Sequence, residues 1–212
     1  MIRTLAKFTA SLFLLAATIA CNAAPQVDVE YKLIKPPQPV APGKIEVVEF
    51  FSYACPHCAE FEPPLQGWLK RKPKDVDYRM VPMVFRAQWK APAKLYYTLE
   101  TMGLVEKYHQ KVYEAINKEG KELFTDEAVK AWAKTAGIDG AKFDAAYDSF
   151  AVDTKLQRGI AMGRAYGVTF TPAMAVNGKY YTGPSMAGGH DYAKYFNVLE
   201  QLIDMERAGA KK

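Results

Sequence analysis

The strongest constraint on the fold comes from a pair of cysteines that directly follows an apolar segment. Residues 45–51 are apolar at both odd and even positions apart from two glutamates, which is typical of a central strand covered on both faces. The motif Cys55-Pro56-His57-Cys58 follows this segment and opens a stretch of helical composition. A thiol at a helix N-terminus faces free N–H groups and the positive end of the helix dipole, which stabilise a thiolate. The motif therefore predicts dithiol–disulfide exchange.

Half of a zinc site is the alternative interpretation of this motif. Zinc in structural sites is held by four ligands, and the rest of the chain offers Cys21, His109 and His190. The chain has 3 cysteines in total, so a second cysteine pair is missing. We therefore favour redox exchange and expect no metal site. His109 lies among charged residues of a predicted helix, and we expect it to be exposed.

The first residues have the order of a secretory signal peptide. Arg3 and Lys7 precede an uncharged apolar stretch over residues 8–20, and small residues follow it. The stretch is too short to span a bilayer as a helix, and the small residues favour cleavage after Ala23. Cys21 leaves a lipoprotein anchor open as a minor alternative, because the residues before it resemble a poor lipoprotein box.

Composition and charge limit the number of domains and the kinds of partner that this chain can have. The chain has 212 residues, of which 50% are hydrophobic, enough for one domain or one domain with an insertion. The net charge is +5, and no basic run is interleaved with aromatic residues, which argues against nucleic-acid binding. Removal of the signal peptide leaves Cys55 and Cys58 as the cysteine pair of an exported protein. In an oxidising compartment such a closely spaced pair persists as a labile disulfide.

Hydrophobic periodicity predicts sheet-forming ends and a helical middle. Strands are predicted at residues 27–33, 45–51, 76–85, 173–176 and from 180. Helices are predicted after Cys58, with a kink at Pro63-Pro64, and at residues 89–102, 105–117, 125–136, 141–150, 153–166 and 191–206. The predicted organisation is a signal peptide (1–23), a sheet-containing domain (24–87 and 152–212) and a helical insertion (88–151).

Local signals support several of these boundaries. Thr125 and Asp139 have the side chains of helix N-caps. Asn177-Gly178 between two β-forming segments is typical of a two-residue hairpin. The order of elements predicts an α/β sheet layer with an all-helical insertion.

Two blocks of the sequence resemble the DsbA family of exported thiol:disulfide interchange proteins, a thioredoxin fold with an inserted helical domain. The first block runs from Glu49 through the Cys-Pro-His-Cys motif to Phe61-Glu62, and the second runs from Gly167 through Thr171-Pro172 to Tyr180. The similarity covers essentially the whole chain after the signal peptide. Thr171 is a departure, because the best-known members carry valine before the proline, and we expect it to alter substrate release.

The resemblance implies a role for each residue of the motif. Cys55 would be the exposed nucleophile, and Cys58 would be the buried thiol that resolves the mixed disulfide. His57 would donate to the Cys55 thiolate and lower its pKa, which makes the disulfide strongly oxidising. Pro56 would help to shape the site.

Three further residues complete the site that the resemblance implies. Thr171 would present its backbone to an extended substrate, and Pro172 would be cis. Glu49 is a carboxylate inside an apolar strand six residues before Cys55, and it is a candidate proton acceptor for Cys58. The alternative for Glu49 is an exposed glutamate at a sheet edge.

The expected function is donation of the Cys55–Cys58 disulfide to newly exported, unfolded polypeptides in the periplasm, by a monomer that needs no cofactor besides this disulfide. A DsbB-like membrane quinone reductase would reoxidise it, docking on the apolar surface around Cys55 and Pro172 that we expect to include Phe170 and Met174. An isomerase or reductase is one alternative, although the segment before residue 45 is too short for the dimerisation domain usual in isomerases of this fold. A non-catalytic exported chaperone is the other.

Overall fold

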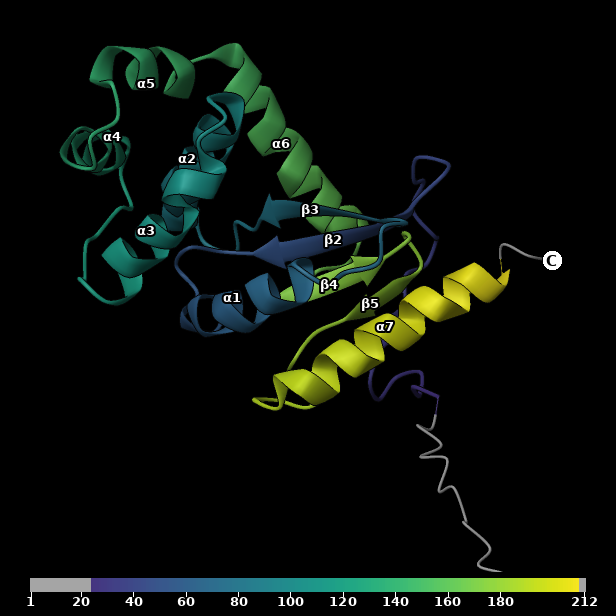
Figure 1. The fold of residues 1–212 in the computed structure, drawn as a ribbon. Coiled ribbons are helices and arrows are strands. Elements are labelled where there is room, and N and C mark those ends of the chain that lie inside the picture. Colours follow the sequence, from purple (N-terminus) through teal and green to yellow (C-terminus); the bar gives the residue numbers. More distant parts are fainter. Residues whose placement is uncertain (1–23, 210–212) are drawn as a thin grey trace, which may run out of the picture.

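A five-stranded mixed sheet forms the centre of the computed structural model, which describes residues 24–209 (Figure 1). The strand order is β1-β5-β4-β2-β3. The central strand β2 (Ile45–Phe51) runs parallel to β3 (Val76–Pro82) and antiparallel to β4 (Ala173–Val176). β5 (Tyr180–Thr182) and the edge strand β1 (Lys32–Leu33) continue the sheet in antiparallel pairing. This arrangement confirms the predicted thioredoxin fold with an inserted helical domain.

Both faces of β2 are buried, as its apolar pattern predicts. On one face Val47 packs in a core formed with α1 (Pro56–Leu69) and α7 (Tyr192–Gly209). On the other face Val48 and Phe50 pack with residues from the end of α6 (Phe150–Ala165) and the segment that follows it. Figure 1 shows α1 and α7 on one side of the sheet and α6 on the other. The loop that follows β2 therefore begins in the interior of the protein, between the helices that cover the two faces of the sheet.

The helices between β3 and β4 form a separate group at one end of the sheet (Figure 1). A 3-10 turn, Ala87–Trp89, leads into α2, and the group consists of α2 (Lys90–Thr101), α3 (Val105–Asn117), α4 (Asp126–Thr135), α5 (Gly140–Tyr147) and the first part of α6. The predicted division at 88–151 cuts through α6, which packs against both α2 and β3. The division into domains stays a prediction.

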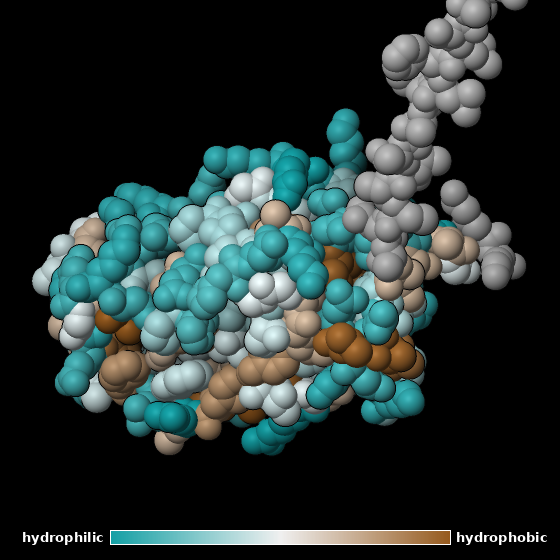
Figure 2. Space-filling view, turned by 90° about the horizontal axis from the view of Figure 1, so that it is seen from below, coloured by the Kyte–Doolittle hydropathy of each residue, from teal (hydrophilic) through white to brown (hydrophobic). Residues whose placement is uncertain are grey.

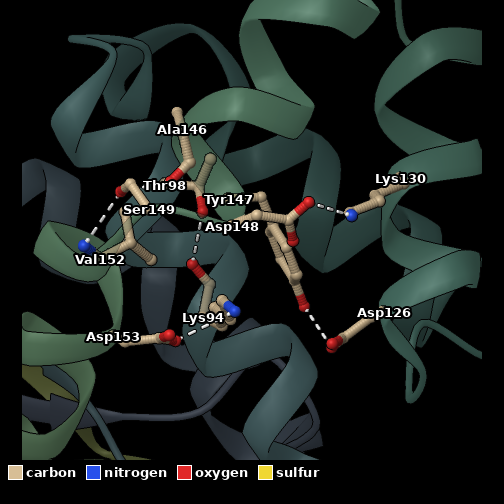
Figure 3. A network of polar contacts seen from close by, with 10 residues as sticks. All are labelled: Lys94, Thr98, Asp126, Lys130, Ala146, Tyr147, Asp148, Ser149, Val152 and Asp153. Carbon is tan, nitrogen blue, oxygen red and sulfur yellow. Dashed lines mark hydrogen bonds and ion pairs between the residues drawn. The ribbon is translucent and has the colours of Figure 1, made fainter.

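A polar network joins four helices of this group around Tyr147 (Figure 3). The Tyr147 hydroxyl donates to Asp126 at 2.7 Å, which connects α5 to the start of α4. The ammonium group of Lys94 in α2 lies 4.6 Å from the centroid of the Tyr147 ring and 3.0 Å from Asp153 in α6. Lys94 is 9% exposed, so its charge is compensated by the aromatic face and the carboxylate. The network fixes the helices relative to one another.

Local sequence signals predicted the caps and the hairpin correctly. The side chains of Thr125 and Asp139 accept hydrogen bonds from the backbone N–H groups of Ala128 and Lys142, as N-caps do. Asn177 and Gly178 have φ values of 49° and 65°, the left-handed conformation that a type I′ hairpin turn requires.

Several predicted boundaries were wrong. The alternating segment 27–33 forms a strand over Lys32–Leu33 alone, because its earlier residues make a turn in which Asp28 has a φ of 64°. The strand predicted at 76–85 ends at Pro82. The helix predicted at 141–150 ends at Tyr147, because Ser149 caps α6 by accepting from the N–H of Val152.

The face of the molecule shown in Figure 2 is mostly hydrophilic, with several hydrophobic patches among the hydrophilic side chains. Large hydrophobic side chains are exposed at Val27, Val29, Leu33, Phe85 and Phe150. In the described part of the chain, no helix has the length and apolar character needed to cross a membrane. The predicted signal peptide and Cys21 lie outside residues 24–209.

Candidate active site

The two cysteines of the motif lie at the start of α1, with Cys58 one helical turn after Cys55 and more deeply buried. Cys55 is the N-cap residue, and Pro56 occupies the first helical position, where its missing N–H is not needed. The backbone N–H of Cys58 donates to the Cys55 carbonyl at 3.1 Å, which closes the first turn. Both residues are free thiols, with Cys55 8% exposed and Cys58 1% exposed. The predicted asymmetry is present, although Cys55 is more enclosed than expected.

The surroundings of Cys55 favour its thiolate. A hydrogen bond from the Cys58 thiol is the largest influence, and with the Thr171 side chain and the backbone N–H groups of Cys58 and His57 it outweighs burial and lowers the pKa of Cys55 to about 6. As a thiol, Cys55 donates from Sγ to the Thr171 carbonyl oxygen at 3.4 Å. Burial, followed by the hydrogen bond to Cys55, raises the pKa of Cys58 well above its usual value. The surroundings therefore stabilise the charged thiolate form of Cys55 and the neutral thiol form of Cys58.

The structure brings the backbone of His57, rather than its imidazole, to Cys55. The His57 side chain is 70% exposed, and Nδ1 lies 3.3 Å from the carboxylate of Glu60. Its ring centroid is 6.3 Å from that of His190. The hydrogen bond from the imidazole to the Cys55 thiolate that the resemblance implied is thus not formed in this arrangement, because the ring turns toward Glu60.

The loop at Pro172 forms the other wall of the site. The Thr171–Pro172 peptide bond is cis, which confirms the prediction. A cavity of about 240 Å³ opens beside this loop, lined by His57, Thr171, Pro172, Pro184, Ser185, Gly189, His190 and Tyr192. Gly183 permits the close packing of the loop, since a Cβ there would lie 2.8 Å from the Pro172 carbonyl oxygen and 2.6 Å from the Phe170 ring. Met174 is fully buried in β4, so the prediction that it forms part of a docking surface was wrong.

Glu49 is buried below the cysteines, as predicted for a carboxylate in the central strand. It is 1% exposed, which excludes the alternative of an exposed edge residue. Burial, followed by the charge of Glu62, raises the pKa of Glu49 to about 8, although a hydrogen bond from the Tyr78 hydroxyl opposes this shift. The charge of Glu49 also contributes to the raised pKa of Cys58. Glu49 is therefore within electrostatic reach of the inner sulfur.

The prediction that His109 is exposed was wrong. His109 is 6% exposed because α3 packs against α1 and turns this residue inward. Its Nδ1 lies 2.8 Å from the Tyr53 hydroxyl, and its Nε2 lies 3.4 Å from Oε2 of Glu62. Glu62, for which no role was predicted, is 3% exposed. A signal was present, because Glu62 follows Cys58 by four residues and so shares the buried face of α1.

The family model that matches this chain, and two relatives and a solved structure that are similar to it, are all of the DsbA kind. A family model described as the DSBA-like thioredoxin domain matches residues 46–197. A protein from Bordetella parapertussis named thiol:disulfide interchange protein DsbA is 43% identical over 206 residues, covering 96% of this chain and 98% of that protein. A protein of the same name from Pseudomonas aeruginosa is 41% identical over 184 residues, covering 86% of each. The crystal structure of Pseudomonas aeruginosa DsbA superposes with a TM-score of 0.82 at 40% identity, covering 87% of this chain and 95% of that one.

Proposed function

The chain belongs to the family of DSBA-like thioredoxin domains and is a thiol:disulfide oxidoreductase that acts on substrate proteins, and we propose that Cys55 and Cys58 are its redox pair. The contrast between the two sulfurs carries this proposal. Cys55 has a pKa of about 6 and partial access to solvent, whereas the pKa of Cys58 is raised and its side chain is enclosed. A thiolate that is stable at neutral pH favours the reduced form, so the disulfide is a good oxidant.

The chemistry follows from this contrast in two exchange steps. A substrate thiolate attacks Sγ of Cys55 in the disulfide, the sulfur–sulfur bond breaks, and its electron pair passes to Cys58, which is then protonated. A second substrate thiolate attacks the substrate sulfur of the mixed disulfide, and Cys55 leaves as the stabilised thiolate. The substrate gains a disulfide, and the protein gains two electrons and becomes the dithiol. The pair needs no further cofactor for this exchange.

Trapping of mixed disulfides tests the roles of the two cysteines. Cys58→Ala should leave a reactive Cys55 that accumulates covalent complexes with substrate proteins on non-reducing gels. Cys55→Ala should trap almost nothing, because the remaining sulfur is enclosed. Equal trapping by both variants, or trapping by Cys55→Ala alone, would overturn the assignment.

The redox potential separates an oxidase from the alternatives. A strongly oxidising DsbA has a reduction potential of about −120 mV, whereas thioredoxin, a reductant, has one of about −270 mV. Because the pKa of Cys55 is about 6, below the value of about 7 in thioredoxin, the reduced form is favoured and we expect a potential above that of thioredoxin. A value close to the second would indicate a reductase. No insulin reduction with both cysteines intact would indicate a non-catalytic binder.

Reoxidation and location complete the proposal. The likeness to DsbA proteins supports a periplasmic oxidase that a DsbB-like membrane quinone reductase recharges. The cavity beside Thr171 and Pro172, together with the half-buried Phe170, offers a docking face next to Cys55. Phe170→Asp should slow reoxidation by such a partner, whereas Phe150→Asp, at an exposed phenylalanine on α6, should not. Equal rates for both variants would argue for a different docking face.

A further inference from the structure

A buried group of titratable side chains lies between the two helices that meet below the cysteines. Glu62 on α1 and His109 on α3 are 3% and 6% exposed, and their Oε2 and Nε2 atoms are 3.4 Å apart. Neither of these atoms has a hydrogen-bond partner of good geometry among residues 24–209, so the 3.4 Å contact is the polar interaction that the structure gives to each of them. A buried carboxylate without a compensating partner is strongly unfavourable. The two side chains therefore depend on each other.

The contacts of both side chains fix the direction of this interaction. The Tyr53 hydroxyl lies 2.8 Å from Nδ1 of His109, and Gln66 donates to the other oxygen of Glu62 at 2.7 Å. If Tyr53 donates to Nδ1, the neutral ring must carry its proton on Nε2. If the ring is doubly protonated, Nε2 again carries a proton. In both cases Nε2–H points to the Glu62 carboxylate, because a bare Nε2 facing that oxygen would be repelled.

The interaction decides which of two buried carboxyl groups is charged. Burial opposes ionisation of Glu62, but the hydrogen bond and the charge of His109 and the hydrogen bond from Gln66 outweigh it, so the pKa of Glu62 is lowered. The pKa of Glu49 is instead raised to about 8, because burial and the negative charge of Glu62 act in the same direction. Two carboxyl groups in one buried site do not both ionise readily, and the group with a cationic or donor partner takes the charge.

We propose that His109 is a positioning residue that holds Glu62 as a carboxylate, so that Glu49 rather than Glu62 carries the exchangeable proton for Cys58. This inference rests on the proposed roles of Cys55 and Cys58. When the disulfide opens, the electron pair of the sulfur–sulfur bond goes to Cys58, and Glu49 gives its proton to that sulfur. Glu49 then recovers a proton from solvent. A carboxyl group that titrates close to neutral pH is suited to both transfers.

Other titratable side chains lie around Glu49, Glu62 and His109 on the neighbouring helices and strands. A test of the proposal must exclude their influence on the titration of Glu49. They are Tyr53 before α1, Cys58 on α1, Tyr78 on β3, Tyr96 on α2, Tyr113 on α3 and Tyr195 on α7. The pKa of each is raised, with burial as the largest cause, so these groups are neutral when Glu49 titrates. Tyr113 provides a matched control, because its hydroxyl is buried in the same region of α3 without a partner.

Infrared titration of the reduced mature protein tests the proposal directly. The carbonyl stretch of protonated Glu49, assigned by its loss in Glu49→Gln, should disappear with a midpoint near pH 8 in the wild type. In His109→Leu the midpoint should fall by about one pH unit or more, because Glu62 then takes up a proton and its repulsion of Glu49 ends. A second carboxyl band, from Glu62, should appear. Tyr113→Phe should change neither band.

Two further variants cover the case in which His109→Leu does not fold. Glu62→Gln should lower the Glu49 midpoint to the same extent, and combining it with His109→Leu should add nothing. His109→Gln, which keeps a donor directed at Glu62, should restore most of the wild-type midpoint. An unchanged midpoint in folded His109→Leu or in Glu62→Gln would overturn the proposal. A wild type without thiol exchange would instead refute the proposed function, since the infrared titration does not depend on activity.

Discussion

The depressed pKa of Cys55 makes the stability of the reduced protein depend on pH in a predictable direction. With a pKa of about 6 in the folded protein and its usual value of 9.0 in the unfolded chain, about 90% of Cys55 is thiolate at pH 7, against about 1% when unfolded. Since the folded pKa is the lower one, the thiolate stabilises the folded reduced protein above the unfolded pKa. This stabilisation is lost as the pH falls through about 6.

The magnitude follows from the two pKa values. The contribution of Cys55 to the free energy of unfolding should be close to zero at pH 5 and about 2.6 kcal/mol at pH 8. Cys58 adds little in this range, because its thiol stays protonated in both states below its usual value of 9.0. Groups shared by the two redox forms largely cancel when the reduced protein is compared with the oxidised one.

Denaturant unfolding of both redox forms at several pH values measures this effect. The free energy of unfolding of the reduced protein, relative to that of the oxidised protein, should rise by about 2.6 kcal/mol from pH 5 to pH 8. The midpoint of thiolate ultraviolet absorbance should lie near pH 6 in the same preparation. A difference that does not vary with pH, together with an absorbance midpoint near 9, would refute the reasoning.

Thr171→Val should raise the absorbance midpoint of Cys55 by about one unit, because a hydrogen bond to a charged group is worth about 1.5 kcal/mol, whereas Thr171→Ser should leave it in place. His57→Ala should raise this midpoint less than Cys58→Ala does, since the largest influence on the pKa of Cys55 is the Cys58 thiol. An equal or larger effect of His57→Ala would show that the His57 ring turns from Glu60 toward the sulfur in solution. Trp68→Ala should lower the free energy of unfolding by about 3–5 kcal/mol in denaturant titrations, because it empties a fully buried site, and a loss below about 1 kcal/mol would contradict this packing.

The features that sequence predicted well are those set by neighbours along the chain. The burial of β2, the caps at Thr125 and Asp139 and the turn at Asn177-Gly178 each depend on a few adjacent residues. The strand predicted at 27–33 failed for the opposite reason. Alternation alone does not supply a pairing partner, and only Lys32–Leu33 meet β5.

The buried polar groups of the site depend on contacts between distant segments. The sequence placed Glu49 inside the sheet but gave no indication that Glu62 would raise its pKa. His109 lies in a segment of charged residues, and its burial follows from the packing of α3 on α1. The orientation of His57 toward Glu60 was equally inaccessible, because a side-chain rotamer is not specified by spacing in a motif.

The shortness of β1 has a consequence for a protein that exchanges disulfides with substrate proteins. Exposed sheet edges pair with extended polypeptides and promote aggregation. Here one edge is a strand of two residues, Lys32–Leu33, followed closely by Pro36, which has no N–H to offer. The opposite edge, β3, also ends in a proline, Pro82. We therefore expect substrate proteins to find little backbone to pair with along the edges of the sheet. Long-lived contacts should then form beside Thr171, where the disulfide can be transferred.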